Sequence, residues 1–159
     1  SLFNGETQDY RFQSQWQQST SVGVSGHVFT KYKAIARPDA NDPESEHFHA
    51  TLLSLVRLQE MYYIAAESEP DPADGYVWLN AARARRGLPT LAAATTSELL
   101  ARLRLEYLRE FTGEGQAFFL YKRLGETMPS AENGAGATPV EITEGTHVPP
   151  VPSSETENR

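Results

Sequence analysis

Apolar residues in the middle of the chain recur with the period of an α-helix. From Phe48 to Ser68 they fall at three- and four-residue steps, which places them on one face of a helix. The pair Glu69-Pro70 ends this helix, because a proline ring disfavours the helical conformation of the residue before it. The apolar stripe consists of Leu55, Leu58, Tyr62 and Ala65, widened by Leu52, Val56 and Tyr63.

A second helix is predicted to begin after Asp71 and to run to Arg86. The Asp71 side chain can cap the first backbone N–H groups, and Pro72 suits the first helical position, where a missing N–H costs nothing. Gly75 weakens the first turn. Gly87 ends the helix, since glycine readily adopts a left-handed conformation.

A third helix is predicted from the capping-box spacing between Thr95 and Glu98. The apolar residues that follow at four-residue steps are Leu99, Leu103, Tyr107 and Phe111. Short connections between three amphipathic helices favour antiparallel neighbours that pack as hairpins.

The flanking segments lack a helical period. Residues 1–25 are polar and rich in Gln, whereas residues 27–36 alternate in the manner of a β-strand. After Gly125 the chain is rich in Pro, Gly and Glu, with one short strand predicted at 140–143. The sequence therefore predicts a mainly α fold with extended N-terminal and C-terminal segments. Residues 1–159 would form a single domain or a fragment, with a helical core at about 47–125 and an acidic tail at 126–159.

Composition excludes several classes of function. The net charge of −7 argues against general nucleic-acid binding, which needs a basic surface. The chain has no cysteine, so thiolate chemistry and zinc–thiolate sites are absent. No apolar run approaches the roughly 20 residues of a membrane span. From Arg83 to Arg123 there are eight bases and four acids, so the acidic tail could fold back onto this region. The alternative is that the basic region and the acidic tail are two separately solvated faces.

Four carboxylates of the third helix and the turn after it raise the question of catalysis. Paired acids at a suitable separation can hydrolyse glycosidic bonds. However, Arg102, Arg104 and Arg109 interleave with them at the three- and four-residue distances of helix ion pairs, so a structural role is favoured. The four acids are Glu98, Glu106, Glu110 and Glu114.

Other candidate sites have weaker support in the sequence. Gly113-Glu114-Gly115 follows a helix rather than a strand, so it is interpreted as a bend into another short segment and not as a phosphate loop. His47 and His49 could share one side of a strand as metal ligands, but no well-spaced third ligand accompanies them. No metal, cofactor or catalytic residue is therefore predicted.

Aromatic and amide side chains near the N-terminus suggest a binding site. Tyr10, Trp16 and Gln17 are candidate ligand contacts, because sugar rings stack on flat apolar faces while amides bond their hydroxyls. The alternative is that these aromatics pack onto the helices. Trp78, beside Leu79 in the second helix, is predicted to lie in the core.

Five motifs, taken in order, resemble the SusD/RagB-type outer-membrane lipoproteins. The first consists of ETQDYR and FTKYK, which are similar to what precedes the first helix in these proteins. The segment VRLQEMYYIAAESE is similar to the family pattern R-L-x-E-x-Y-x-I-A-A-E, and WLNAARARRGLP is similar to its next helix. LRLEYLREFTGEGQAFFLYKRLG resembles E-R-x-x-E-L-x-x-E-G followed by an aromatic and a basic pair, and HVPPVPSSETENR resembles the closing P-I-P-x-x-E-x-x-x-N. The residues that match the family motifs, and to which the resemblance assigns a structural role, are Arg57, Glu60, Asn80, Arg83, Glu106, Arg109, Glu114, Gly115 and Arg123.

This resemblance implies a tetratricopeptide-like scaffold and a non-catalytic, glycan- or nutrient-binding protein. It implies a place on the outer face of the outer membrane, held by an N-terminal lipid, with a SusC-like TonB-dependent transporter and the upstream part of the same protein as partners. Arg57 with Glu60, and Glu106 with Arg109, would then be scaffold pairs. Ala117 and Leu120 replace the usual Arg and Asp, which indicates a divergent subfamily.

Two other functions remain open from the residues themselves. The helices could form a repeat module whose role is to dock another protein. Alternatively, Glu106, Glu110 or Glu114 could serve a glycan-processing enzyme.

Overall fold

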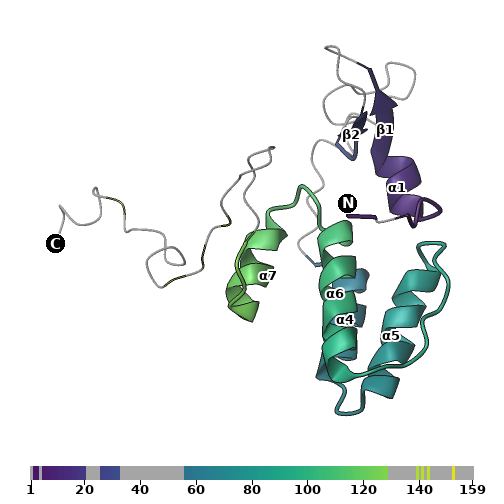
Figure 1. The fold of residues 1–159 in the computed structure, drawn as a ribbon, viewed down its shortest axis with the longest axis vertical. Helices are drawn as coiled ribbons and strands as arrows, with labels where there is room; N and C mark the ends of the chain where they lie inside the picture. The colour runs from purple at the N-terminus through teal and green to yellow at the C-terminus, as the bar shows by residue number, and fades with distance from the viewer. Residues whose placement is uncertain are drawn as a thin grey trace. The chain divides into compact units, whose positions relative to one another are not determined.

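The computed structural model describes residues 2–3, 5–20, 26–32 and 56–128, together with the single residues 139, 141, 143 and 152. The chain divides into two units, Ser1–Glu110 and Phe111–Arg159. The mainly α fold predicted from the sequence is confirmed, with one two-stranded sheet in the described residues (Figure 1). None of the helices in the described ranges is both long enough and apolar enough to cross a bilayer.

Helices α4 (Leu58–Ser68) and α5 (Pro72–Ala84) form an antiparallel hairpin in the first unit. Asp71 caps α5 as predicted, because its carboxylate accepts the N–H of Ala73 at 2.8 Å. Gly87, with a φ of 70°, lies in the left-handed region just beyond the C-terminal end of α5, as its position in the sequence predicts.

Helix α6 (Thr96–Glu110) begins at the predicted capping box. The Glu98 carboxylate accepts the backbone N–H of Thr95 at 3.1 Å and the Thr95 hydroxyl at 2.7 Å. In return, the Thr95 hydroxyl accepts the N–H of Glu98 at 3.3 Å. These reciprocal bonds satisfy backbone donors that the helix itself leaves unpaired.

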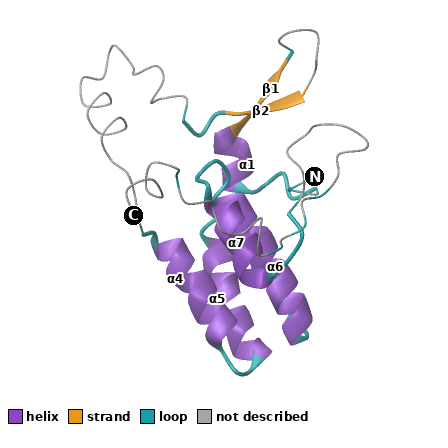
Figure 2. Ribbon diagram, turned by 90° about the vertical axis from the view of Figure 1, so that its left-hand side faces the viewer, coloured by secondary structure: helices purple, strands orange, loops and turns teal. Residues whose placement is uncertain are grey.

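The direction of α6 differs from the predicted succession of hairpins. Arg57, the residue before α4, lies 3.2 Å from Glu110 at the end of α6. The ring of Tyr63 in the middle of α4 lies 6.3 Å from the ring of Tyr107, so these two helices are antiparallel. The start of α5, at Gly75, contacts Leu99 at the start of α6, so α5 and α6 run in parallel. The segment 88–95 makes this possible, since eight extended residues reach back along a helix of this length (Figures 1 and 2).

The buried face of α4 lies one residue away from the predicted stripe. Tyr63 and Ala66 are buried, whereas Leu58 is 71% exposed. The prediction for Trp78 was also wrong, because its ring is 39% exposed and its indole N–H donates to Glu69 at 2.9 Å. Residues 48–55 of the predicted first helix lie outside the described residues. The apolar core of the helical region consists of Tyr63, Ala66, Tyr76, Leu79, Ala82, Leu88, Leu99 and Leu103.

The N-terminal segment is more ordered than its composition predicts. Helix α1 (Tyr10–Gln15) leads directly into strand β1 (Trp16–Ser19), which pairs antiparallel with β2 (Gly26–Phe29). A helix of six residues is too short to show a period, so the sequence pattern missed it. The strand predicted at 27–36 ends at Phe29 and is followed by a turn at residues 31–32.

In the second unit, α7 (Gln116–Leu124) lies between two glycines with left-handed backbone, Gly115 (φ 73°) and Gly125 (φ 64°). The turn at residues 111–115 is the bend into a short segment that was predicted. The strand predicted at 140–143 falls partly outside the described residues, and Glu141 and Thr143, which are described, belong to no strand.

Gly75 allows α4, α5 and α6 to approach closely. A Cβ atom at this position would lie 2.7 Å from the carbonyl oxygen of Ala66 and 2.5 Å from Cδ2 of Leu99. The glycine that weakens the first turn of α5 is therefore needed for the packing of α5 against α4 and α6.

We expect Gly75→Ala to lower the free energy of unfolding by about 1–3 kcal/mol, because the added methyl group meets backbone as well as a side chain. Urea unfolding followed by circular dichroism would measure this loss. Gly26→Ala is the matched control, since nothing lies within 4 Å of a Cβ atom there. Equal stability of the two variants would contradict this account of the packing.

Candidate functional site

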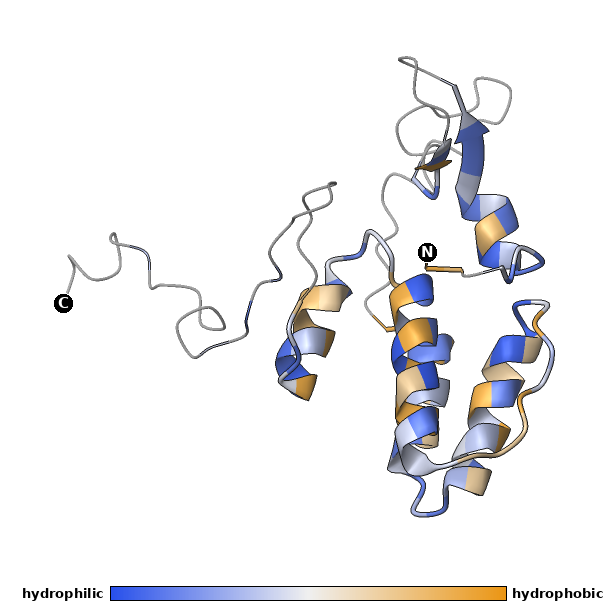
Figure 3. Ribbon diagram, viewed as in Figure 1, coloured by the Kyte–Doolittle hydropathy of each residue, from blue (hydrophilic) through white to orange (hydrophobic). Residues whose placement is uncertain are grey.

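Nine charged side chains form a buried ion cluster in the first unit. They come from the N-terminal segment, from α5 and its C-terminal end, from α6, and from the residue before α4. Four are acids and five are arginines, and most are almost fully covered. Figure 3 shows the hydrophilic and hydrophobic residues interleaved along α5 and α6. The cluster consists of Glu6, Asp9, Arg11, Arg57, Arg83, Arg86, Glu106, Arg109 and Glu110.

Glu106 is the centre of the ion cluster. It is 1% exposed, and its Oε1 accepts hydrogen bonds from Arg83 at 2.5 Å and from Arg109 at 3.2 Å. Its Oε2 accepts a bond from Arg11 at 2.5 Å. The pair of Glu106 with Arg109 is therefore formed as the i,i+3 spacing predicts, within a larger network than a single helix can supply.

Glu110 holds a second group of arginines. Arg86 binds it with two parallel bonds, from Nε at 2.9 Å and from Nη2 at 2.7 Å. Arg57 lies 3.2 Å from the Glu110 carboxylate and also donates to its backbone carbonyl at 3.0 Å. The predicted partner of Arg57 was wrong: within the described residues, Glu60 meets Arg57 through its backbone N–H and not through its carboxylate.

The N-terminal segment contributes the remaining charges. Asp9 caps α1 by accepting the N–H of Arg11, and it also binds the Arg11 guanidinium through both carboxylate oxygens at 3.0 and 2.6 Å. Burial by itself would lower the pKa of Arg11, but the hydrogen bond to Asp9 and the charge of Glu106 raise it. Arg11 therefore remains charged wherever the protein is folded.

Glu6 of the N-terminal segment completes the ion cluster by pairing with two of its arginines. Its carboxylate accepts bonds from Arg83 at 2.9 Å and from Arg109 at 2.6 Å. Burial raises the pKa of Glu6, but these two hydrogen bonds outweigh burial and hold the pKa below its ordinary value of 4.5. Arg109 also donates to the carbonyl of Leu2, and its guanidinium lies over the ring of Phe3, 5.2 Å from the centroid.

This arrangement suits a frame rather than a reaction. A carboxylate that serves as a general acid or nucleophile must reach a substrate, whereas both oxygens of Glu106 and of Glu110 already accept bonds from arginines. Both side chains are also closed to solvent. The charges instead tie the N-terminal segment to α5 and α6.

The predicted ligand contacts near the N-terminus lie in different surroundings. The Trp16 ring packs against Phe29 at 5.1 Å and Phe3 at 6.4 Å, in a chain of aromatic contacts across the hairpin. Tyr10 is 57% exposed, and Gln17 is an exposed residue of β1 opposite Val28. In the described part of the chain no ring contact joins Tyr10 to Trp16, and Trp16 and Gln17, as successive residues of β1, point to opposite faces of the strand.

Other residues of the predicted motifs hold loops and turns. Asn80 fixes the segment after α5, since its side-chain amide donates to the carbonyl of Leu91 at 2.9 Å and accepts the Leu91 N–H at 2.8 Å. Glu114 and Gly115 form the turn before α7, and Arg123 lies in the last turn of that helix.

No group of metal-ligating side chains gathers within the described residues. His47, His49 and His147 lie outside that part of the chain, and His27 packs its ring against Phe12 at 4.9 Å.

Sequence reasoning missed the residues that complete the ion cluster. Glu6, Asp9 and Arg11 lie in the segment that was expected to be extended, and Arg86 was treated only as a helix end. A signal for one of them exists, because Asp-x-Arg at a helix start suits both a cap and a local ion pair. No local sequence pattern indicates which distant acids and arginines these residues pair with.

Comparison with known proteins identifies one match. A sequence model of the SusD family matches residues 3–150. No curated protein and no solved structure is significantly similar to the chain.

We expect Glu106→Gln to destabilise the protein by about 3–5 kcal/mol, because it leaves buried arginines without a charge partner. Chemical denaturation would measure the loss. Glu60→Gln is the matched control on a helix surface and should cost less than about 1 kcal/mol. If the two variants unfold at the same denaturant concentration, Glu106 is not the centre of the frame.

Acid should weaken the fold through Glu6. Its pKa is lower in the folded state than in the unfolded state, so its contribution to stability is complete above about pH 4.5 and is lost as the pH falls through the folded pKa. Unfolding curves in urea between pH 7 and pH 3 would show this loss. In Glu6→Gln the stability should depend less steeply on pH in the acid range, and an unchanged slope would exclude this role.

Proposed function

Because the chain belongs to the SusD family, we propose that it is part of a non-catalytic nutrient-binding protein that captures glycans at the outer face of the outer membrane. SusD-family proteins are in general nutrient-binding, cell-surface proteins of the outer membrane, and they are generally not enzymes. The match over residues 3–150 is the observation that carries the proposal.

The ion cluster supports binding rather than catalysis. In a glycosidase, two carboxylates face each other across a space that the substrate enters. Glu106 and Glu110 lie one helical turn apart, and arginines from α5, from its C-terminal end and from the N-terminal segment occupy both of them. Such a frame keeps a binding surface rigid, which limits the entropy that ligand capture costs.

In this proposal the glycan is held by ring stacking and by hydrogen bonds to its hydroxyls. Trp16, Tyr10 and Gln17 remain candidates for such contacts. The aromatic neighbours Phe3 and Phe29 support Trp16 from two sides, so its ring keeps one orientation. Gln17 is exposed on the opposite face of β1 from Trp16, where its amide can bond a hydroxyl of another part of the glycan.

The proposed partner is a SusC-like TonB-dependent transporter, together with the upstream part of the same protein. We propose that the helical frame docks them and that an N-terminal lipid outside residues 1–159 anchors the assembly. Several large apolar side chains on α4 and α5 support a docking role, because they are at least 42% exposed. They are Leu58, Met61, Ile64 and Val77.

The same apolar side chains favour a second candidate, a helical module that only docks another protein. The two functions differ in what happens at Trp16. Removal of its ring should weaken glycan binding under the first proposal and should change nothing under the second.

We expect Trp16→Ala to weaken retention in an affinity gel that contains the bound glycan by about threefold to tenfold, the usual contribution of one stacked ring. Trp78→Ala is the matched control, since Trp78 lies on α5 and not in the β1–β2 hairpin that contains Trp16. Calorimetry and pull-down from solubilised outer membranes would be done with the full-length protein. If it binds no glycan, no peptide and no transporter, the proposed function is wrong.

A further inference from the structure

A groove of about 390 Å³ lies on the first unit, between α6 and the segment that leads into it. It is open to solvent on one side and has the size of a small-molecule pocket. It belongs neither to the ion cluster nor to the N-terminal aromatics. Its lining consists of Tyr76, Leu91, Ala92, Ala94, Glu98, Ala101, Arg102 and Leu105.

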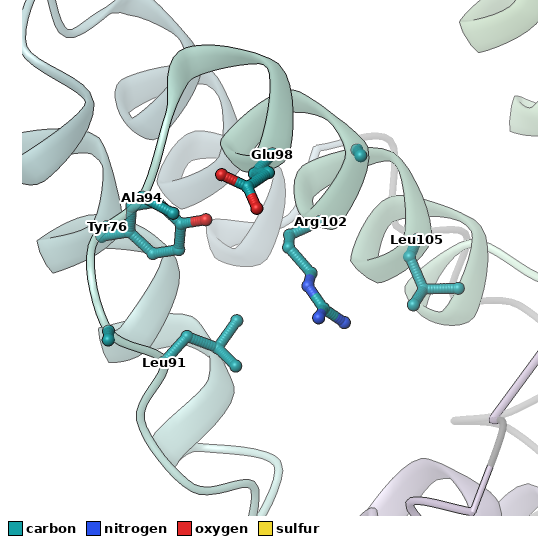
Figure 4. A pocket seen from close by; sticks show the side chains of 8 residues that line it. Tyr76, Leu91, Ala94, Glu98, Arg102 and Leu105 are labelled. Carbon is teal, nitrogen blue, oxygen red and sulfur yellow. The ribbon is translucent and has the colours of Figure 1, made fainter.

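The hydroxyl of Tyr76 is the unusual feature of this groove. The side chain is buried, with 4% exposed, yet no hydrogen bond among the described residues uses its hydroxyl. The oxygen is not among the buried, unpartnered side-chain atoms of the described residues, so it is the end of the side chain that solvent in the groove reaches. Figure 4 shows the Tyr76 oxygen directed into the groove, on the side of Glu98. The buried ring therefore fixes a hydroxyl that can both donate and accept a hydrogen bond, and either water or a bound molecule in the groove can pair with it.

Two charged side chains of α6 complete the polar wall. Glu98 and Arg102 are one turn apart and line the same groove, and Figure 4 shows the Arg102 guanidinium extending between Leu91 and Leu105. Oε2 of Glu98 is occupied by Thr95, whereas no hydrogen bond within the described ranges uses Oε1 or the Arg102 guanidinium. The bonds from Thr95 lower the pKa of Glu98, so the free oxygen is an acceptor at neutral pH.

The rest of the lining is apolar and well fixed. Alanines form much of the lining, which leaves room for a ring. Asn80 holds Leu91 by two hydrogen bonds, and Arg83 donates to the carbonyl of Pro89 at 3.2 Å. The segment that forms one wall therefore has its position set before any ligand arrives, which lowers the cost of binding.

From this geometry we propose that the groove binds a saccharide unit, one or two neutral sugar rings of a longer glycan. Sugar hydroxyls would accept bonds from Arg102, donate to Oε1 of Glu98 and bond the Tyr76 hydroxyl, while the C–H face of the ring lies on the alanines. The inference rests on the proposed glycan-binding function and assigns part of it to a named site.

A neutral ligand fits the charges of the groove better than an amino acid or a peptide end does. Glu98 and Arg102 together carry no net charge, so no field favours an anion or a cation. An ammonium group carries three donors, whereas Glu98 offers it only one free oxygen. Hydroxyl groups need single donors and acceptors, which is what the three side chains provide.

Isothermal titration calorimetry on this chain would test the inference, with neutral malto-, xylo-, manno- and cello-oligosaccharides of four to six units as probes. Tyr76→Phe removes only the hydroxyl, and Arg102→Gln removes only the charged donor. We expect each to raise Kd by about threefold to tenfold, the usual effect of one hydrogen bond, with little change in melting temperature. Tyr121→Phe and Arg85→Gln, outside the groove lining, should change Kd by less than about twofold.

Each result of the titrations has a separate meaning. If the chain binds an oligosaccharide and neither groove variant weakens it, the groove is not the site, while the proposed function stands. If the dipeptide Gly-Leu binds with the same dependence on Tyr76 and Arg102, the ligand class is wrong. If the chain binds none of the saccharides, the inference is wrong, and the calorimetry on the full-length protein decides the proposed function separately.

Discussion

The structure of the first unit depends on keeping the Glu106 carboxylate charged in a place that water does not reach. An isolated buried charge would cost many kcal/mol, so it persists only where several donors surround it. Three arginines do so here, one from α1, one from α5 and one from α6 itself. Each arginine is in turn bound by a second acid, Asp9 or Glu6. The cluster is therefore satisfied only when all these elements are in place together.

The need to pair every buried charge determines which elements pack together, and it adds little to the free energy of unfolding. Buried ion pairs contribute little net stability compared with apolar packing, but a misplaced element would leave charges unpaired and cost several kcal/mol. The N-terminal segment has few apolar residues, yet the Asp9–Arg11 pair positions it against α6. The packing of α5 against α4 and α6 also depends on a single residue, because a Cβ atom at Gly75 would collide with Ala66 and Leu99.

The rigid frame and the proposed binding contacts use different residues. Glu106 and Glu110, whose spacing in the sequence suggests catalysis, are paired with arginines of the ion cluster. Glu98, which looks like an ordinary helix cap, keeps one oxygen free beside Tyr76 and Arg102.

The sequence by itself determined the features that depend on neighbours along the chain. Asp71, Gly87 and the Thr95–Glu98 box set helix ends through bonds within a few residues, so local spacing was enough to predict them. The buried face of α4, the exposure of Trp78 and the partner of Arg57 depended on tertiary contacts that local spacing does not encode. The parallel course of α5 and α6 was likewise decided by the path of residues 88–95, which also lines the groove at Tyr76. Local hydrogen bonds fix where elements begin and end, whereas the pairing of buried charges fixes which elements meet.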